Sequence, residues 1–492
     1  METCKHRPRS ECKLPQCVYV DTKKRTYCRK ANNTKRVKLN APRSPKEAPP
    51  RIEPTSAMKR SATKKIVRFI QQSRPFLELV CEGSSQCLSL GRHTNEIQKF
   101  FSNFADFEYV GGRLKKIGKL SGNGFVREVR YARDGYVAYA ILKSNASSDS
   151  DNLAYEYLVG TKFINLMNKQ YPCFLSTYGL LYYKDEKAYT TIRDDINSIY
   201  DTREFLQDSL ELQTTVDFKK ACLQSQYVTI LIQHIHNSIT FFDALRDGGD
   251  FIKHHMVHVL FILYHSLASL SKVFTHYDLH TMNVLLLRPY PGKTIQYIYH
   301  QKDGTTSFKC PYIPKIIDYG RCFFDSGPVN SKQIYDKVCA VRECGKCGED
   351  YGFTLLSPTR YLEISSQQKN ESHDLKLMYQ LDVIMPYVNS GVSTLNQYNK
   401  FAAFRQVYKM FSRVKYGVNL PEEHKTNGTV EDTTLHPKGD VVANVTDAYR
   451  ELKKIVTHKK VIEENNVNQP DATVAGTLHI YEDGRPMEYF RA

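Results

Sequence analysis

The chain contains the polar sequence His276-Tyr277-Asp278-Leu279-His280-Thr281-Met282-Asn283, and the apolar run Val284–Leu287 follows it directly. Four apolar residues after a polar loop indicate a short buried strand. Asp278 and Asn283 stand five residues apart on this loop. One side chain can therefore accept a proton from a hydroxyl group while the other binds a metal ion. The loop predicts a catalytic centre beside a buried strand.

A second apolar strand, Pro314–Ile317, ends in a carboxylate. Asp318 follows it directly in Lys315-Ile-Ile-Asp318-Tyr-Gly320, forty residues beyond Asp278. Carboxylate and amide oxygens are hard ligands of the kind that Mg²⁺ prefers. Asn283 and Asp318 are therefore the predicted Mg²⁺ ligands. Residues 288–312 lie between the two strands and indicate a turn plus a hairpin, with Asp303-Gly304 as the turn signal.

A glycine-rich segment lies upstream, at Gly122-Asn123-Gly124-Phe125-Val126-Arg127-Glu128-Val129. Glycines let backbone N–H groups approach phosphates without a Cβ in the way, although a Gly-rich hairpin turn looks the same. Lys143 ends an alternating strand fourteen residues beyond Val129, where a cation suits phosphate oxygens. Glu156 has apolar neighbours on the next expected helix, 152–167, and is the predicted partner of Lys143.

These segments supply, in order, the parts that phosphoryl transfer requires: a backbone cradle, a cation, metal ligands and a carboxylate for the acceptor hydroxyl. The order resembles the eukaryotic-type protein kinase superfamily over residues 114–379. The resemblance implies an α+β, bilobal protein-kinase-like fold with a small β-rich N-lobe and a larger helical C-lobe. A Cys-rich basic N-terminal arm would precede it. ATP and Mg²⁺ are the implied cofactors.

The resemblance also implies a role for individual residues. Asp278 would be the catalytic base, Lys143 would bind phosphate, and Glu156 would hold Lys143 in place. Asp374, in Ser372-His-Asp374-Leu, would brace the catalytic loop. The implied cofactor-binding residues include two from the adenine hinge that follows an apolar strand, and in full they are Gly122, Asn123, Gly124, Phe125, Val126, Val129, Lys143, Gln233 and Ile235.

The chain departs from the family pattern at several positions. Arg127 replaces the third glycine, Tyr277 stands where many kinases have Arg, and His280 stands where protein serine/threonine kinases usually place Lys. Tyr319 replaces the Phe of Asp-Phe-Gly, and no Ala-Pro-Glu element follows. Asp-Leu-His at 278–280 resembles haspin-like and aminoglycoside/choline-kinase-like enzymes. With the Ser-His-Asp-Leu segment, the combination resembles divergent serine/threonine kinases of large DNA viruses, iridoviruses above all.

Three functions are compatible with these features: a serine/threonine protein kinase, a small-molecule phosphotransferase, or a catalytically idle kinase-like virion or binding protein. His280 and the missing Ala-Pro-Glu favour the second. The third is disfavoured because Lys143, Asp278, Asn283 and Asp318 are all present. The basic N-terminal arm indicates macromolecular partners, so we expect transfer of the ATP γ-phosphate to a protein hydroxyl.

The positive charge is concentrated at the N-terminus. Residues 1–68 hold 20 Lys and Arg and five acids, so +15 of the net +17 falls there. Such an arm contacts polyanions (nucleic acid or an acidic surface), acts as an address, or is a solvated disordered tail. The chain is expected to divide into a Cys-rich basic module (1–31), a basic Pro-containing linker (32–65), an N-lobe with insertions (66–235), a C-lobe (236–460) and a C-terminal tail or hairpin (461–492).

Two groups of cysteines stand out. Cys4, Cys12, Cys17 and Cys28 form the first, and a Zn²⁺ site, free thiols or disulfides all remain compatible with it. Residues 339–347 contain the second, Cys339-Ala-Val-Arg-Glu-Cys344-Gly-Lys-Cys347, which resembles a zinc knuckle or else provides partly buried thiols.

Neither a secretory signal nor a membrane span is expected. The first residues carry no apolar segment. The most apolar stretch, 257–270, is interrupted by His258, His265 and serines and is too short to cross a bilayer. These features predict an intracellular protein, located in a host cytoplasm or associated with a virion, whose cysteines are mostly thiols or metal ligands.

Overall fold

The structure is a computed structural model of the 492-residue chain. It describes residues 17–22, 25–30, 99–104, 114–118, 124–133, 136–148, 153–199, 201–247, 249–341, 353–357, 360–364, 369–387, 397–414, 441–468 and 474–492. The chain divides into two compact units, Met1–Lys64 and Lys65–Ala492. In the first unit, strands β1 (Cys17–Thr22) and β2 (Arg25–Lys30) form an antiparallel hairpin.

The second unit is α+β, which confirms the expected class. Its largest sheet in the described residues has six strands in the order β3-β4-β5-β8-β6-β7, and neighbouring strands are antiparallel. Their bounds are β3 (Lys115–Ile117), β4 (Gly124–Arg133), β5 (Tyr136–Asn145), β6 (Thr177–Tyr183), β7 (Leu210–Gln213) and β8 (Val228–Gln233). Every residue of the central strand β8 is buried, which agrees with its apolar sequence.

Alternation along β5 gives this strand two different faces. Ala138, Ala140 and Leu142 are buried on one face. Ile141 and Lys143 point to the other face and are partly exposed. Because strand side chains alternate with a period of two, Lys143 shares its face with Ile141. This face of the sheet is the one that lines the site described below.

Short helices accompany the sheet. They are α3 (Leu153–Val159), which continues through a wider turn at Gly160–Ile164 into α4 (Asn165–Met167), then α5 (Glu186–Asp194), α6 (Thr202–Ser209) and α7 (Phe218–Leu223). An aspartate caps the N-terminus of each of the last three. The side chains of Asp185, Asp201 and Asp217 accept hydrogen bonds from backbone N–H groups three residues later. These caps pair N–H groups that have no partner within the helix.

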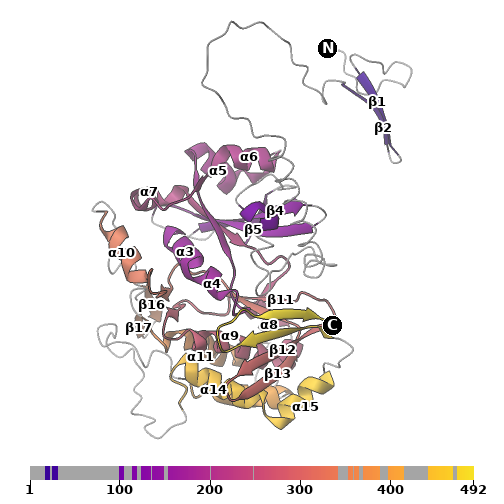
Figure 1. Cartoon of the computed structure of the whole chain (residues 1–492), viewed down its shortest axis with the longest axis vertical. Coiled ribbons are helices and arrows are strands. Elements are labelled where there is room, and N and C mark those ends of the chain that lie inside the picture. The colour runs from indigo at the N-terminus through magenta and orange to yellow at the C-terminus, as the bar shows by residue number, and fades with distance from the viewer. Residues whose placement is uncertain are drawn as a thin grey trace, which may run out of the picture. The chain divides into compact units, whose positions relative to one another are not determined.

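The rest of this unit combines helices with smaller sheets, and α9 (Met256–Ser269) lies among them (Figure 1). Residues 256–267 of α9 are all buried, as expected for a helix that is apolar on nearly every face. Burial lowers the pKa of His258 and of His265 to about 3, so both imidazoles are neutral core side chains. The other helices are α8 (Phe241–Asp247), α10 (Ser331–Cys339), α11 (Lys376–Ile384), α13 (Ala402–Phe411), α14 (Val445–Val456) and α15 (Lys459–Asn468).

Smaller sheets alternate with these helices along the chain. β11 (Val284–Leu287) pairs with β14 (Ile313–Ile316) on one side and β9 (Ile239–Thr240) on the other. β10 (Phe274–Thr275) pairs with β15 (Phe323–Phe324). The predicted catalytic loop joins β10 to β11, and Asp318 follows β14, so strand pairing brings the two polar segments together. A further hairpin consists of β16 (Phe353–Ser357) and β17 (Arg360–Ile364).

The segment 288–312 forms the expected hairpin, but it does not stand alone. β12 (Thr294–Gln301) and β13 (Gly304–Cys310) are antiparallel. β12 also pairs in parallel with β18 (Val474–Tyr481), which in turn forms a hairpin with β19 (Glu488–Arg491). Of the residues expected as a C-terminal tail or hairpin (461–492), 474–481 and 488–491 are therefore part of a four-stranded sheet, β13-β12-β18-β19, whereas 461–468 belong to α15.

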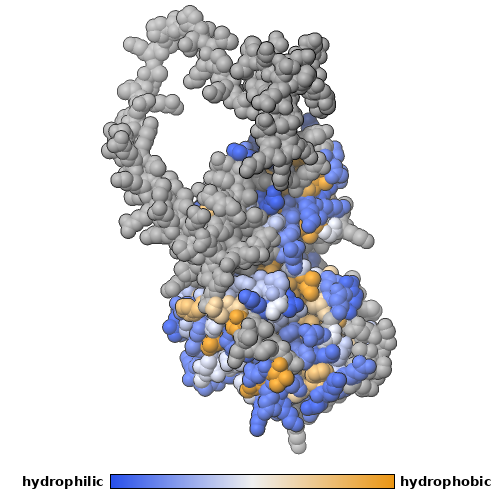
Figure 2. Space-filling model, turned by 90° about the vertical axis from the view of Figure 1, so that its right-hand side faces the viewer, coloured by the Kyte–Doolittle hydropathy of each residue, from blue (hydrophilic) through white to orange (hydrophobic). Residues whose placement is uncertain are grey.

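The described surface is predominantly polar on the face that Figure 2 shows, with apolar residues in small separate groups. Isolated exposed apolar residues are ordinary features of folded proteins. Across the described residues, we find no helix that combines the length and the apolar character needed to cross a membrane.

Candidate functional site

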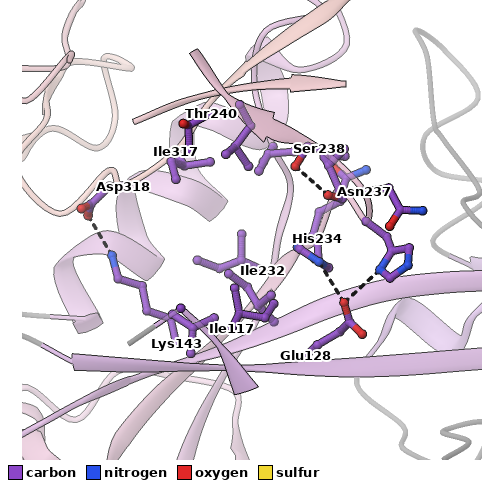
Figure 3. A pocket seen from close by; sticks show the side chains of 18 of the residues that line it. Ile117, Glu128, Lys143, Ile232, His234, Asn237, Ser238, Thr240, Ile317 and Asp318 are labelled. Atoms are coloured by element: carbon purple, nitrogen blue, oxygen red, sulfur yellow. Dashed lines mark hydrogen bonds and ion pairs between the residues drawn. The ribbon is translucent and has the colours of Figure 1, made fainter. Parts of the chain in front are cut away.

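A cleft of about 650 Å³ opens on one face of the six-stranded sheet (Figure 3). Val126 and Ile141 line it from β4 and β5, and Leu285 and Ile317 line it from β11 and the residue after β14. A flat apolar group can therefore pack between two layers of aliphatic side chains. The volume falls in the range of roughly 300–1,000 Å³ that is usual for small-molecule sites.

The segment after β8 forms one wall of this cleft. Residues 233–238 line it, including the predicted hinge residues Gln233 and Ile235. Gln233 is anchored at Ser176, because its backbone N–H donates to the Ser176 carbonyl at 2.8 Å and its Oε1 accepts from the Ser176 N–H at 3.2 Å. The His234 N–H donates to the Tyr139 carbonyl at 3.0 Å. The wall is thus a backbone segment that the sheet holds in place.

Lys143 lies at the opposite end of the cleft, where Figure 3 shows its contact with Asp318, and it also contacts Glu156. Its Nζ is 2.7 Å from Glu156 Oε2 and 2.8 Å from Asp318 Oδ1. The Glu156 side chain is 1% exposed, whereas that of Asp318 is 37% exposed. Burial by itself would lower the pKa of Lys143, but the two carboxylates hold it above its usual value. The ammonium ion is therefore fixed in its charged form.

Asp318 occupies a special backbone position. Its φ of +71° lies in the left-handed region, which non-glycine residues seldom adopt. Burial would raise the pKa of its carboxyl group, but the ammonium of Lys143 holds it below the usual value. The preceding Ile317 N–H donates to the Asn283 carbonyl at 3.0 Å. This bond brings Asn283 and Asp318 together at the adjacent ends of two paired strands.

Asp374 anchors the start of the loop from His276 to Asn283 by hydrogen bonds to its backbone. The carboxylate of this buried residue accepts hydrogen bonds from the backbone N–H groups of His276, at 2.8 Å, and Tyr277, at 2.9 Å. Asn283 Nδ2 donates to the Asp278 carbonyl at 3.0 Å and closes the loop on itself. Tyr277 has a φ of +65°, so the two bonds from Asp374 fix the chain where it turns.

Two cations surround the carboxylate of Asp278. Lys376 Nζ, on α11, is 2.9 Å from Oδ1, and Arg321 Nη1 is 2.9 Å from Oδ2. His280 Nε2 is 3.7 Å from Oδ1. Burial would raise the pKa of Asp278, but Lys376 and then Arg321 overcome this effect and hold the pKa below its usual value. Asp278 is therefore an ionised, tightly oriented carboxylate.

The glycine-rich segment lies differently from its predicted arrangement. Gly122 and Asn123 lie outside the described residues. Gly124 begins β4, where a Cβ would collide with the Ser144 carbonyl oxygen, so this strand pair requires glycine there. Val126 lines the cleft as predicted.

Phe125 and Val129 are not brought to the cleft, although they were predicted to bind the cofactor. Both are buried on the opposite face of β4, because residues at odd and even positions of a strand point to opposite sides. Arg127 shares their face. Its Nε donates to the Ile192 carbonyl at 2.8 Å and its Nη2 donates to the Arg193 carbonyl, so it caps the end of α5 rather than facing a phosphate.

Several lining residues were not singled out from the sequence. Ile117, Gly118, Ile141, Leu285 and Ile317 line the cleft. Ile141 and Ile317 belong to the apolar runs that lead to Lys143 and Asp318, and this is the signal that could have identified them. Lys376 and Arg321 were missed too. Each stands two or three residues after an aspartate, Asp374 or Asp318, but nothing in such a spacing indicates a contact with Asp278.

The structure describes only some of the cysteines that stand out in the sequence. Cys4, Cys12, Cys344 and Cys347 lie outside the described residues. Cys17 lies opposite Lys30 and Cys28 lies opposite Tyr19 in the hairpin of β1 and β2. Cys310 and Cys322 are buried free thiols in the second unit. Burial raises the pKa of Cys310 to about 12, as expected for a thiol that packs as a small apolar group.

Neither a protein-family model nor a curated protein matches this chain. The interpretation of the site therefore depends on the arrangement of its residues.

Proposed function

We propose that this chain is an ATP- and Mg²⁺-dependent phosphotransferase of the protein-kinase fold, and that it transfers the γ-phosphate to a serine or threonine hydroxyl of a protein. The contact of Lys143 with both Glu156 and Asp318, in a cleft beside the Asp278 loop, carries this proposal. The six-stranded sheet would be the N-lobe and the helical part the C-lobe.

The donor groups of the cleft suit a nucleotide and its metal. The aliphatic side chains of Val126, Ile141, Leu285 and Ile317 suit a purine ring, which binds by packing on both faces. Asn283 and Asp318 offer an amide oxygen and a carboxylate, which are hard donors that fit Mg²⁺. When bound, Mg²⁺ would neutralise charge on the phosphate oxygens.

Asp278 would orient the acceptor hydroxyl. It accepts the proton that this hydroxyl loses as the hydroxyl oxygen bonds to the γ-phosphorus and the bond from that phosphorus to the leaving ADP oxygen breaks. A carboxylate with a lowered pKa is a weak base. In a loose transition state, however, positioning matters more than base strength. The contacts with Lys376 and Arg321 provide that positioning.

Two departures from the family pattern have a physical account in this arrangement. His280 stands where protein serine/threonine kinases usually have Lys, and Lys376 places an ammonium ion beside Asp278 from another element. Tyr319 replaces Phe, and its hydroxyl group is fully used. It donates to the Ile316 carbonyl at 2.6 Å and accepts from the Leu175 N–H at 3.1 Å. The added oxygen is therefore not left unpaired in the core.

The surface beside the catalytic loop favours a protein acceptor over a small molecule. A groove of about 430 Å³ there is lined by His280, Met282, Tyr379 and Val383, among others. Met282 is 49% exposed and Val383 50% exposed. Because His280 also approaches Asp278, a polypeptide that placed an apolar side chain in this groove would bring a nearby hydroxyl to the loop.

The test is transfer from labelled ATP with Mg²⁺ to casein-type and histone-type proteins, and to aminoglycosides and choline. We expect transfer to protein that is lost in Asp318→Ala and in Asp278→Asn. Asp336→Ala is the matched control, because Asp336 is exposed and contacts only the surface residue Lys332 among the ion pairs of the described chain. Transfer to small molecules alone would replace the protein-kinase proposal with the small-molecule alternative. Failure to bind Mg-ATP at all would refute both and support a kinase-like binding protein.

A further inference from the structure

A second polar cluster lies in the same cleft, at the end away from Lys143 and Asp318 (Figure 3). Glu128 Oε2 is 3.0 Å from His234 Nε2 and 3.0 Å from His236 Nδ1. One ligand atom from each of these three residues lies within 4.8 Å of the other two. Two imidazole nitrogens therefore converge on a single carboxylate oxygen.

The backbone brings these side chains together from two elements. Glu128 projects from β4 on its cleft face, two residues beyond Val126. His234 and His236 follow β8 in a His-x-His sequence, and both line the cleft. The hydrogen bond from the His234 N–H to the Tyr139 carbonyl fixes the start of this segment.

Tyr139 orients the two imidazole rings. It stacks on His236 with ring centroids 4.2 Å apart and an interplanar angle of 7°, and it meets His234 nearly edge to face at 80°. The side chains are also shielded, since Glu128 is 10% exposed, His234 16% and His236 19%. Rings held by packing lose little rotational freedom when they bind a ligand.

The donor set is characteristic of a transition metal rather than of Mg²⁺. Imidazole nitrogen suits zinc-class ions, whereas Mg²⁺ prefers oxygen alone. Two histidines and one glutamate, with an open fourth position, form a known ligand set for Zn²⁺ at bond lengths of about 2.0–2.2 Å.

We propose that Glu128, His234 and His236 bind a divalent zinc-class ion, with the fourth coordination position open to the cleft. Because Glu128 belongs to β4 and the histidines follow β8, the ion links a strand of the sheet to the wall segment 233–238. The site is separate from the proposed Mg²⁺ ligands, and the inference does not rest on the proposed function. The alternative is that Glu128, His234 and His236 bind no metal and only hydrogen-bond to one another, which joins β4 to the wall segment.

The experiment measures Co²⁺ and Zn²⁺ binding to the full chain. The cysteine-rich N-terminus is a second place where metal can bind, and Co²⁺ separates the two by absorption. Thiolate ligands give a strong ligand-to-metal charge-transfer band, whereas imidazole and carboxylate give only the weaker visible bands. We expect the wild type to bind one equivalent of Co²⁺ whose absorption spectrum lacks the thiolate charge-transfer band. Glu128→Gln and the double variant His234→Ala/His236→Ala should lower the affinity for this ion by about tenfold to a hundredfold.

The matched control is the double variant His300→Ala/His479→Ala. These two histidines also lie close together, with 2.9 Å between Nε2 and Nδ1, but they are on β12 and β18. The control variant should still bind the equivalent of Co²⁺ that shows no thiolate band. The proposal is overturned if Glu128→Gln, which preserves side-chain shape, binds Co²⁺ and Zn²⁺ like the wild type. It is also overturned if every bound equivalent shows the thiolate band. Raised thermal stability on Zn²⁺ addition, present in the control and absent in Glu128→Gln, would support it independently of any catalytic assay.

Discussion

Replacing Lys143 with Met should separate stability from activity at the site. The ammonium ion lies within 2.8 Å of two carboxylates, so its removal leaves two negative charges without their common partner. Breaking a buried pair by removing one partner costs about 3–5 kcal/mol. Glu156 is buried, so the cost of breaking its pair with Lys143 falls within this range. Asp318 is 37% exposed, so solvent screens the charge that it is left with and the cost of breaking its pair is smaller. We expect Lys143→Met to lower the free energy of unfolding by about 3 kcal/mol.

A second substitution should restore stability without restoring activity. Glu156→Gln removes the uncompensated charge at nearly constant volume, so the double variant Lys143→Met/Glu156→Gln should regain about 2 kcal/mol. Phosphate transfer should stay at least about 100-fold below wild type in both variants, because neither carries a cation for the phosphates. Lys332→Met, which breaks an exposed pair with Asp336, is the control and should change stability by less than about 1 kcal/mol.

Urea unfolding followed by far-ultraviolet circular dichroism provides the stability measurement. The chain has no Trp, so tryptophan fluorescence cannot be used. Transfer from labelled ATP provides the activity measurement. If Lys143→Met unfolds like the wild type, or if the double variant is no more stable than the single one, the reasoning about the buried carboxylates is wrong. Wild-type transfer by either variant would refute the assigned role of Lys143.

Lys376→Met should raise the pKa of Asp278, because it removes the ammonium ion that lies 2.9 Å away. If the carboxylate must be ionised, the acidic limb of the pH–rate profile moves to higher pH, and an unmoved limb would argue against the contact. Arg127→Met should lower the free energy of unfolding by about 1–3 kcal/mol, since it leaves the buried Ile192 carbonyl without its donor. The KM for ATP should not change, as Arg127 points away from the cleft, and a raised KM would instead place it at the phosphates.

The parts of the site that could be predicted share one property: each is a polar residue at a strand end or on the helix that follows. Lys143, Asn283 and Asp318 stand within two residues of the ends of strands that belong to two sheets. Strand ends converge in space, so the order of such residues along the chain already indicates a shared site. Glu156 could be predicted from its apolar neighbours, because a buried carboxylate needs a cation.

The parts that could not be predicted depend on register or on distant packing. A shift of one residue in a strand moves every side chain to the other face, and a glycine pattern does not define where β4 begins. Phe125 and Val129, which the resemblance implied as cofactor-binding residues, therefore lie on the face of β4 opposite Val126. Lys376 is 98 residues from Asp278 in sequence, and Glu128 is 108 residues from His236. Such contacts follow from the docking of separate elements, which local sequence does not encode.

The parallel pairing of β12 with β18 has a consequence for how the chain reaches its native state. His300 and His479, which meet across this pair, are 179 residues apart in sequence. The β12–β13 hairpin can form early, because its strands are local. Its other edge then stays open until β18 arrives, and closing so long a loop is slow. During that interval Tyr297 and Tyr299, which are buried in the final sheet, belong to a strand with one unpaired edge. We therefore expect aggregation during refolding to begin at this edge, and slower arrival of β18 to increase it.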